Sequence, residues 1–274
     1  MISNFTHLHL HTCYSLSSGT IRINDLINIA KKNKLKSLAL TDHLNIFGAI
    51  KFYNKCIEAK IKPILGCEIP IIYKNNMPIG NIVLLCMNID GYYNLNKILS
   101  FIHTSRSSSL GANIDLLDNY KSNLICLSGG RNGICGLNSL TKSVSDSEDI
   151  IKDISQLFLD KFYVEIDKTE RQNEDLYINK SLLIASKLNL PVVATNDVLF
   201  ISDSDYEANE VKVAINQKTK LDDRINQNDY SPNQFFKTEQ EIISLFSAYP
   251  AAIQNISEIV KMCSLKLHAF KYNL

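Results

Sequence analysis

Several features that mark whole classes of protein are missing from this 274-residue sequence. No apolar run is long enough to span a membrane, and the N-terminus lacks the basic-then-apolar pattern of a signal peptide. We therefore expect a cytoplasmic protein with no membrane role. Lys and Arg together number 29 against 28 for Asp and Glu, so the net charge predicts no polyanionic partner. A role with nucleic acid would have to depend on a local site.

Motifs of common catalytic and nucleotide-binding classes are also absent. The sequence has no G-x-G-x-x-G or Walker loop, no G-x-S-x-G elbow, and no stripe of basic residues interleaved with aromatics. Gly129, Gly130 and Gly133 are too few and wrongly spaced for a phosphate loop and indicate an ordinary turn. The seven cysteines include no C-x-x-C and lie mostly in apolar segments, which is typical of reduced, buried thiols.

Short apolar runs alternate with amphipathic runs over about the first 200 residues. The apolar runs predict strands at 5–9, 37–41, 63–67, 82–87, 124–127, 162–166 and 192–195. The amphipathic runs predict helices at 23–35, 49–59, 93–102, 149–158 and 175–188. Strands that are apolar on both faces and alternate with helices favour an α/β fold with a parallel sheet. We predict a TIM-like β/α barrel of about seven strands, with an open doubly wound sheet as the alternative.

Beyond about residue 205 the pattern changes to helices only. Helical spacing recurs at 206–216, 239–246 and 251–262, and a polar loop spans 220–234. We therefore divide the chain into a barrel of residues 1–205 and a helical extension of residues 206–274. The chain stops after residues 271–274 without a capping signal, as we expect of a fragment cut from a longer protein.

Three histidines alternate near the N-terminus in His7-Leu8-His9-Leu10-His11. On a strand, the two-residue period would place all three imidazoles on one face. Imidazoles that converge at a strand end would form one side of a metal cage. A polar edge strand whose histidines face water is the alternative, but three histidines in register favour the metal site.

Further imidazoles and carboxylates follow other predicted strands. Asp42, His43, Glu68 and Asp197 lie at strand ends, and His103 lies on the helical stretch after the fourth strand. Because barrel enzymes place their active sites at the C-terminal ends of strands, we expect these side chains to meet His9 and His11. Singly, each has an ordinary explanation, such as a helix cap or a surface residue. Together, mixed His and carboxylate ligands suit zinc, manganese or iron in a multinuclear site that hydrolyses phosphate esters.

Several short stretches of the sequence resemble motifs of the polymerase-and-histidinol-phosphatase (PHP) domain family. They are His9-Leu10-His11-Thr12 with Tyr14-Ser15-Leu16, and then Leu40-Thr41-Asp42-His43. More narrowly, the chain resembles the PHP domains at the N-termini of bacterial DNA polymerase III alpha subunits. The phrases that carry this narrower resemblance lie at 43–48, 61–66, 162–165, 190–198 and 228–232. The helical region resembles those subunits too, so the resemblance covers nearly the whole chain.

The resemblance implies a distorted barrel of seven strands and a site for up to three metal ions. The residues that match the first metal position are all present: His9, His11, Glu68 and Asp197. His7 falls outside the family's ligand positions, so a structural role is implied for it. The resemblance therefore predicts one retained divalent ion, zinc or manganese, that braces the barrel mouth.

The other two metal positions are incomplete in this sequence. The second matches Glu68 and His103, but its remaining ligand position holds Gly130. The third matches His43, while its other two ligand positions hold Ser18 and Leu199. Loss of even an outer partner of a metal ligand costs roughly 10–100-fold in metal affinity or activity. We therefore expect at most a second ion and no third, with little phosphoesterase activity.

The resemblance also implies a role and partners. The domain would be a structural and docking module of a DNA-directed DNA polymerase, a nucleotidyltransferase whose own active site lies downstream, beginning with the palm domain. Its partners would be the proofreading exonuclease subunit and other holoenzyme subunits, and it would meet DNA through the full-length polymerase. The alternatives are a stand-alone metal-dependent phosphoesterase or 3′-to-5′ exonuclease and, with less support, a phosphatase of the histidinol-phosphate type.

Overall fold

A computed structural model of the protein describes residues 5–73, 77–105, 110–141, 144–224 and 229–267. Asn228, which belongs to one of the family phrases, and the chain end at 271–274 lie outside these residues. No helix in the described part is long and apolar enough to cross a membrane. The seven cysteines are all free thiols, and all except Cys13 are buried, as their apolar surroundings predicted.

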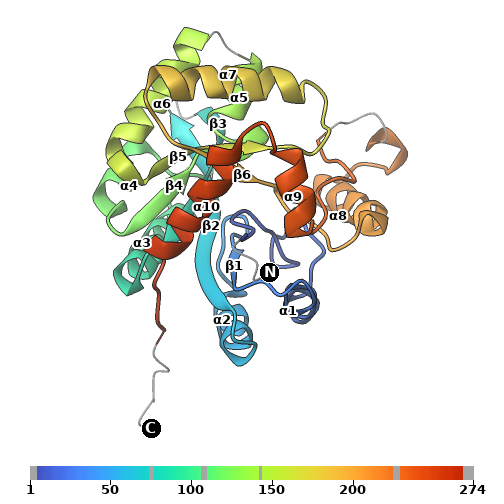
Figure 1. Cartoon of the computed structure of the whole chain (residues 1–274). Coiled ribbons are helices and arrows are strands. Elements are labelled where there is room, and N and C mark those ends of the chain that lie inside the picture. The colour runs from blue at the N-terminus through green and yellow to red at the C-terminus, as the bar shows by residue number, and fades with distance from the viewer. Residues whose placement is uncertain (1–4, 74–76, 106–109, 142–143, 225–228, 268–274) are drawn as a thin grey trace.

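Six strands form one curled sheet whose order follows the chain (Figure 1). They are β1 (Ser37–Leu40), β2 (Lys62–Tyr73), β3 (Met77–Cys86), β4 (Leu124–Leu127), β5 (Phe162–Asp167) and β6 (Val192–Thr195). β1 pairs parallel with β2, as β4 does with β5 and β5 with β6, but β3 is antiparallel to both its neighbours. The prediction of a wholly parallel sheet was therefore wrong at β3. β2 and β3 extend well beyond the predicted 63–67 and 82–87, because each continues to pair with the other.

The stretch 5–9, predicted as the first strand, does not form a strand. Its backbone lies beside β1, and it and the residues that follow it exchange hydrogen bonds with Ala39 and Thr41 on one side and with Val198 on the other. The ladder is interrupted because Leu10 N donates to the side-chain hydroxyl of Thr41 (2.8 Å) instead of a carbonyl, and one isolated bridge, Leu10–Val198, remains. The described residues therefore form a curled sheet of six strands, and the predicted seven-stranded barrel was wrong in strand number.

The helices within the described residues follow most of the predicted ranges. They are α1 (Ile23–Lys32), α2 (Ala49–Glu58), α3 (Ile89–Thr104), α4 (Ile114–Tyr120), α5 (Gly136–Thr141), α6 (Val144–Phe158), α7 (Glu174–Lys187), α8 (Tyr206–Gln217), α9 (Glu239–Leu245) and α10 (Pro250–Met262). α3 and α6 begin earlier than predicted. α4 and α5 were not predicted, because helices of seven and six residues are too short to show a clear period.

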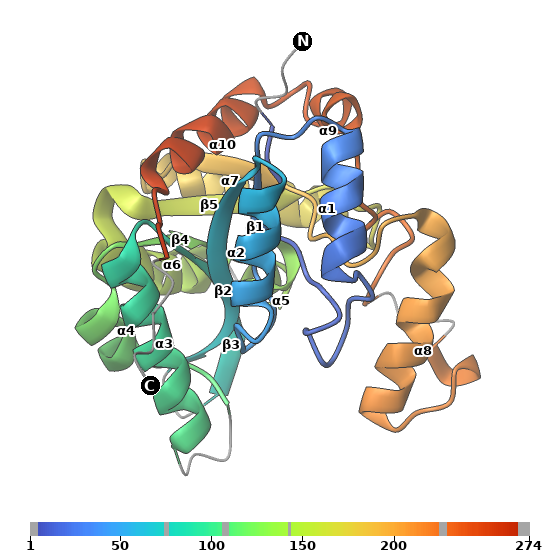
Figure 2. The ribbon, with the colours of Figure 1, turned by 90° about the horizontal axis from the view of Figure 1, so that it is seen from below.

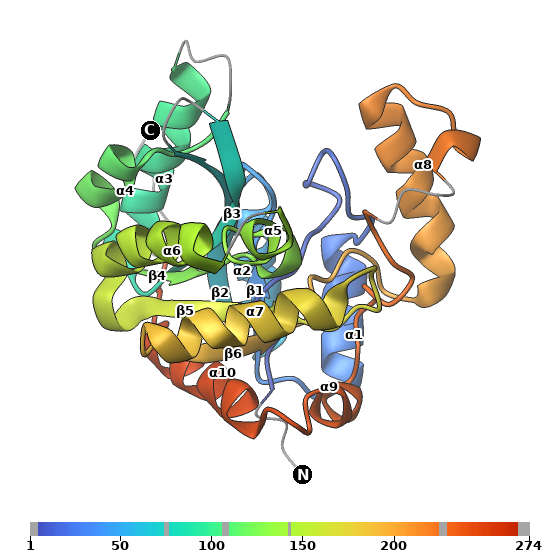
Figure 3. The ribbon, with the colours of Figure 1, turned by 90° about the horizontal axis from the view of Figure 1, so that it is seen from above.

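The two faces of the sheet carry separate apolar clusters, because successive strand residues point to opposite sides. Leu38 and Leu84 belong to a cluster with α1, α2, α3 and α6. Ala39 and Val83 belong to a second cluster with residues of α9 and α10, including Ile256. α10 lies along the sheet, whereas α8 projects from the side of the molecule (Figures 2 and 3). The boundary at residue 205 stays a prediction, but α9 and α10 share a core with the strands.

Candidate metal centre

Four of the predicted ligands converge from three segments of the chain. His9 and His11 lie on the stretch beside β1, Glu68 lies in the middle of β2, and Asp197 follows β6. His11 Nε2 is 3.5 Å from Asp197 Oδ1, and His9 Nε2 is 3.7 Å from Glu68 Oε1 and 3.9 Å from Asp197 Oδ1. All four side chains are buried. We call these four residues the histidine side of the site.

Hydrogen bonds fix which nitrogen of each imidazole is free. His9 Nδ1 is 2.8 Å from Glu165 Oε1, so Nδ1 carries the proton and donates it, and Nε2 bears the lone pair. His11 Nδ1 is 3.0 Å from the hydroxyl of Ser15, which donates its own proton to Asp42 (2.8 Å). His11 Nδ1 must therefore donate as well, which leaves its Nε2 lone pair free. The two Nε2 atoms face each other at 3.1 Å.

Two lone pairs this close repel each other unless a proton or a metal ion neutralises them. Burial opposes a charge on His9, but the hydrogen bond and charge of Glu165, with the charges of Asp197 and Glu68, raise its pKa to about 10. A proton on His9 Nε2 therefore satisfies both rings in the protein alone. A divalent ion would satisfy the same lone pairs together with two carboxylates, and this donor set suits zinc or manganese. The residues present fit such an ion.

Both carboxylates of the histidine side are held ionised. Burial would raise the pKa of Glu68, but its hydrogen bond to His43 (Nδ1 to Oε2, 2.7 Å) and the nearby imidazole charges lower it to about 2. The same balance of burial against imidazole and Arg171 charges holds the pKa of Asp197 well below its usual range. Asp197 also has a φ of +46°, a left-handed conformation that costs a residue other than glycine about 1–3 kcal/mol. Strain of this size is often stored at functional sites.

The histidine side opens into a cleft of about 210 Å³. Ser18, His43 and Leu199, the residues at the third family metal position, line this cleft. Of these three, His43 forms a hydrogen bond with the histidine side, through Glu68. The hydroxyl of Ser18 is a hydrogen-bond partner of Tyr230, whose pKa burial raises to about 12. Of the three ligands that the family pattern places at the third metal position, the cleft wall therefore carries one, His43.

His103 lies apart from this group in the structure. It is an exposed residue of α3, and its Nε2 donates to the carbonyl oxygen of Leu44 at 2.7 Å. The expectation that His103 would meet His9 and His11 was therefore wrong for the geometry seen here, because α3 extends the side chain to the backbone that follows His43 instead. His7 also lies apart. It is buried between Phe5 and Phe236, and its Nε2 is 2.9 Å from the carbonyl oxygen of Lys237.

The space beside Gly130, where the family has a metal ligand, is filled by the carboxylate of Asp167. Gly130 starts a turn after β4, as predicted, with a φ of +61°, and a Cβ built on it would lie 2.2 Å from Asp167 Oδ2. That carboxylate accepts from Arg131 N (2.8 Å) and from Arg171 Nη2 (3.2 Å). Arg171 is buried, and its Nη2 lies 3.6 Å from Asp197 Oδ2. We call Gly130, Asp167 and Arg171 the arginine side of the site.

Four residues of the site were not assigned to it from the sequence: Ser15, Glu165, Asp167 and Arg171, although Ser15 and Glu165 fall within phrases that carry the family resemblance. Glu165 and Asp167 end the apolar strand β5, so the strand-end argument that selected Asp42 and Asp197 could have found them. Ser15 and Arg171 lie on loops and carry no such signal. Asp42 accepts from the backbone and hydroxyl of Thr12 and from Ser15, so it organises the loop after His11 and does not cap α2.

The same loop is tied to α8. Lys212 Nζ lies 2.7 Å from the carbonyl oxygens of Ser15 and Gly19 and 3.3 Å from those of Cys13 and Ser18. One ammonium therefore satisfies carbonyls along most of the loop. Through Ser15, this contact also bears on the orientation of His11.

A family model for the PHP domain matches residues 7–169, more than half of the chain. The chain belongs to the PHP domain family. The resemblance read from the sequence is thus confirmed for the family.

The relatives of this PHP domain are much longer proteins. DNA polymerase III subunit alpha of Pseudomonas fluorescens is 35% identical over 277 residues, which cover 100% of this chain and 24% of the relative. The subunit of Escherichia coli K12 is 33% identical over 273 residues, covering 98% and 24%. The PHP domain thus spans about a quarter of these relatives, in their N-terminal region. Among solved structures, an amidohydrolase from Chromobacterium violaceum aligns with a TM-score of 0.47 at 13% identity, over 72% of this chain and 88% of that one.

Proposed function

We propose that this PHP domain is the N-terminal region of a DNA polymerase III alpha subunit and serves there as a structural and docking module. The observation that carries the proposal is the match of the whole chain, at 33–35% identity, to the N-terminal quarter of such subunits. Nucleotidyl transfer to DNA would then be performed by the part of the longer protein that follows this chain.

The histidine side would hold one divalent ion, zinc or manganese. His9, His11, Glu68 and Asp197 come from the β1 side, from β2 and from the turn after β6, so one ion would tie together segments far apart in the sequence. When bound, such an ion can also act as a Lewis acid and lower the pKa of a coordinated water. Glu165 and Ser15 would orient the two imidazoles, and Asp42 would hold the loop that carries Ser15.

Two measurements test this proposal. The first is the coding sequence beyond Leu274: we expect it to continue into a polymerase palm, and a stop codon after Leu274 would contradict the assignment. The second is binding of the purified chain to the proofreading exonuclease subunit of the same organism, by titration calorimetry with and without EDTA. We expect binding that weakens when the metal is removed. Absence of binding under both conditions would refute the docking role.

A second candidate function is metal-dependent phosphoester hydrolysis. It is favoured by His9, His11 and Asp197, whose ligand atoms lie within 4.8 Å of one another, with Glu68 beside them at a cleft. The test is hydrolysis of bis(4-nitrophenyl) phosphate and of single-stranded DNA from its 3′ end, with manganese or zinc. We expect little turnover, because the second and third ligand sets are incomplete. Robust turnover that disappears in His9→Ala would establish this second function instead.

A further inference from the structure

The interior of the site holds more negative than positive charge. Four buried carboxylates gather there: Glu68, Glu165, Asp167 and Asp197. Within the described residues, Arg171 is the one buried guanidinium whose nitrogen reaches members of this group. Buried charges need partners, because the interior solvates them poorly. The charge of Arg171 is permanent, since a guanidinium does not lose its proton in proteins.

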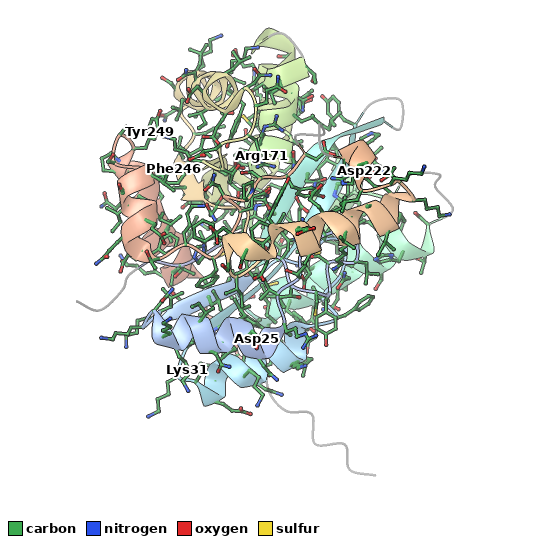
Figure 4. The ribbon with its side chains drawn as sticks, turned by 90° about the vertical axis from the view of Figure 1, so that its right-hand side faces the viewer. Asp25, Lys31, Arg171, Asp222, Phe246 and Tyr249 are labelled. Carbon is green, nitrogen blue, oxygen red and sulfur yellow. The ribbon has the colours of Figure 1, made fainter. Side chains whose placement is uncertain are left out.

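The guanidinium is held on three of its nitrogens. Nη2 is 3.2 Å from Asp167 Oδ1 and 3.6 Å from Asp197 Oδ2, Nε donates to the hydroxyl of Thr169 (2.9 Å), and Nη1 donates to the carbonyl of Asp229 (3.3 Å). Arg171 lies near the middle of the molecule in Figure 4. A planar, pre-organised group with this many fixed contacts is a permanent part of the site.

Asp197 is shared between the two sides of the site. Its Oδ1 faces His9 and His11, at 3.9 Å and 3.5 Å. Its Oδ2 accepts from Gln234 Nε2 at 2.8 Å and lies 3.6 Å from Arg171. One oxygen is therefore available to a metal ion on the histidine side, while the other is already engaged by protein donors. Asp197 cannot bridge two metal ions while Arg171 and Gln234 hold Oδ2.

We propose that the guanidinium of Arg171 takes the place of a second metal ion and limits the centre to one divalent ion. Arg171 supplies one permanent positive charge beside Asp167 and Asp197, so these carboxylates need less charge from metal ions than they would without it. The inference rests on the proposed metal site of the histidine side, and it adds what excludes further ions from that site.

The experiment compares Arg171→Gln with the unchanged chain in manganese alone. Bound manganese per chain is counted after dialysis, and its electron paramagnetic resonance spectrum reports whether two ions are exchange-coupled. We expect one ion in the unchanged chain and two coupled ions in Arg171→Gln, with the first ion bound at least about tenfold more tightly. Arg171→Lys keeps a charge and should hold one ion.

Arg22→Gln is the matched control, because it removes the charge of an exposed arginine that precedes α1 and lies outside the site. It should hold one ion with unchanged affinity. One uncoupled ion of unchanged affinity in Arg171→Gln would overturn the inference and leave the proposed metal site standing. No ion in the unchanged chain but one in Arg171→Gln would show that Arg171 excludes the first ion and not a second, which overturns both the inference and the proposed single-ion site. No ion in either chain would overturn both.

Removal of a buried charge partner could also unfold the chain. Thermal unfolding with and without manganese decides that case. If Arg171→Gln melts far below the unchanged chain without metal and recovers with manganese, an added ion replaces the lost cation, as the inference requires. If manganese raises its melting temperature no more than that of Arg22→Gln, the guanidinium acts only as a structural ion pair and the inference is wrong.

Discussion

The histidine side and the arginine side are both buried, both contain ionised carboxylates and meet at Asp197, yet their polar atoms differ in which hydrogen-bond partners the protein supplies. On the histidine side, the Nδ1–H groups of His9 and His11 donate hydrogen bonds to Glu165 and Ser15. The two Nε2 atoms are left facing each other. On the arginine side, backbone and guanidinium donors satisfy Asp167. The difference teaches that buried carboxylates alone do not mark a candidate metal site. What distinguishes the histidine side is a pair of facing nitrogen atoms that need a proton or an ion between them.

The largest effect should come from removing a ligand on the histidine side. His9→Ala deletes one of the two facing lone pairs, so we expect a loss of manganese or zinc affinity well above 100-fold, the upper end of what outer partners cost. Titration calorimetry measures it. His103→Ala is the control, because His103 contacts the carbonyl of Leu44. The metal affinity of this variant should stay unchanged. A comparable loss in His103→Ala would show that α3 contributes to the centre.

A smaller effect should follow when only the orientation of His9 is disturbed. Glu165→Gln keeps the shape but removes the charge that fixes the His9 tautomer, so we expect metal affinity to fall about 10–100-fold. Loss of the Glu165 charge also weakens the binding of the competing proton to His9. We still expect metal affinity to fall, because a doubly charged ion is stabilised by the carboxylate more than a singly charged proton is. Glu58→Gln, an exposed charge change on α2, should leave the affinity unaltered. Equal affinities in Glu165→Gln and the unchanged chain would remove Glu165 from the site.

On the arginine side, the expected effect is on stability. Gly130→Ala places a Cβ against the Asp167 carboxylate at a left-handed φ, and we expect the free energy of unfolding to fall by about 2 kcal/mol in urea titrations. Gly48→Ala is the matched control, because Gly48 has an ordinary helical φ of −78° and its Cβ would meet the ring of Tyr14. Losses of the same size in both variants would mean that the crowding at Gly130 is not special.

The smallest effect should be the change in metal affinity per pH unit. The pKa of His9 is raised from 6.5 to about 10 without metal, so across neutral pH an incoming ion must displace its proton. Affinity for manganese should rise about tenfold per pH unit between pH 6.5 and 8.5. In the metal-free chain the sign is opposite. The stability contributed by protonated His9 is complete below pH 6.5 and declines as the pH rises towards 10. A flat affinity profile would show that His9 binds no proton at the site.

The alternation of histidines could be read from the sequence because it depends on local backbone geometry. His9 and His11 point to one site although the stretch 5–9 forms no strand, since an extended backbone keeps the two-residue period. The sheet pairing could not be read in the same way. The spacing between 63–67 and 82–87 is long enough for a crossover, and only the continued pairing of β2 with β3 reveals an antiparallel turn.

Contacts between distant loops account for what the sequence did not reveal. Arg171 meets Asp197 across 26 positions of the chain, and no periodic pattern relates the two. The direction of the His103 side chain depends on where α3 ends relative to Leu44, which the helical period does not fix. Glu68 was found because it is a carboxylate near an apolar run, although it lies in the middle of β2 and not at its end.

The crowding at Gly130 also bears on any attempt to build a ligand at this position. The Cβ of a side chain introduced at position 130 would clash with Asp167, and the left-handed backbone there favours glycine. Asp167 is in turn held by Arg131 N and Arg171. A substitution at position 130 alone would therefore be unfavourable, and a second change that moves the Asp167 carboxylate would have to accompany it.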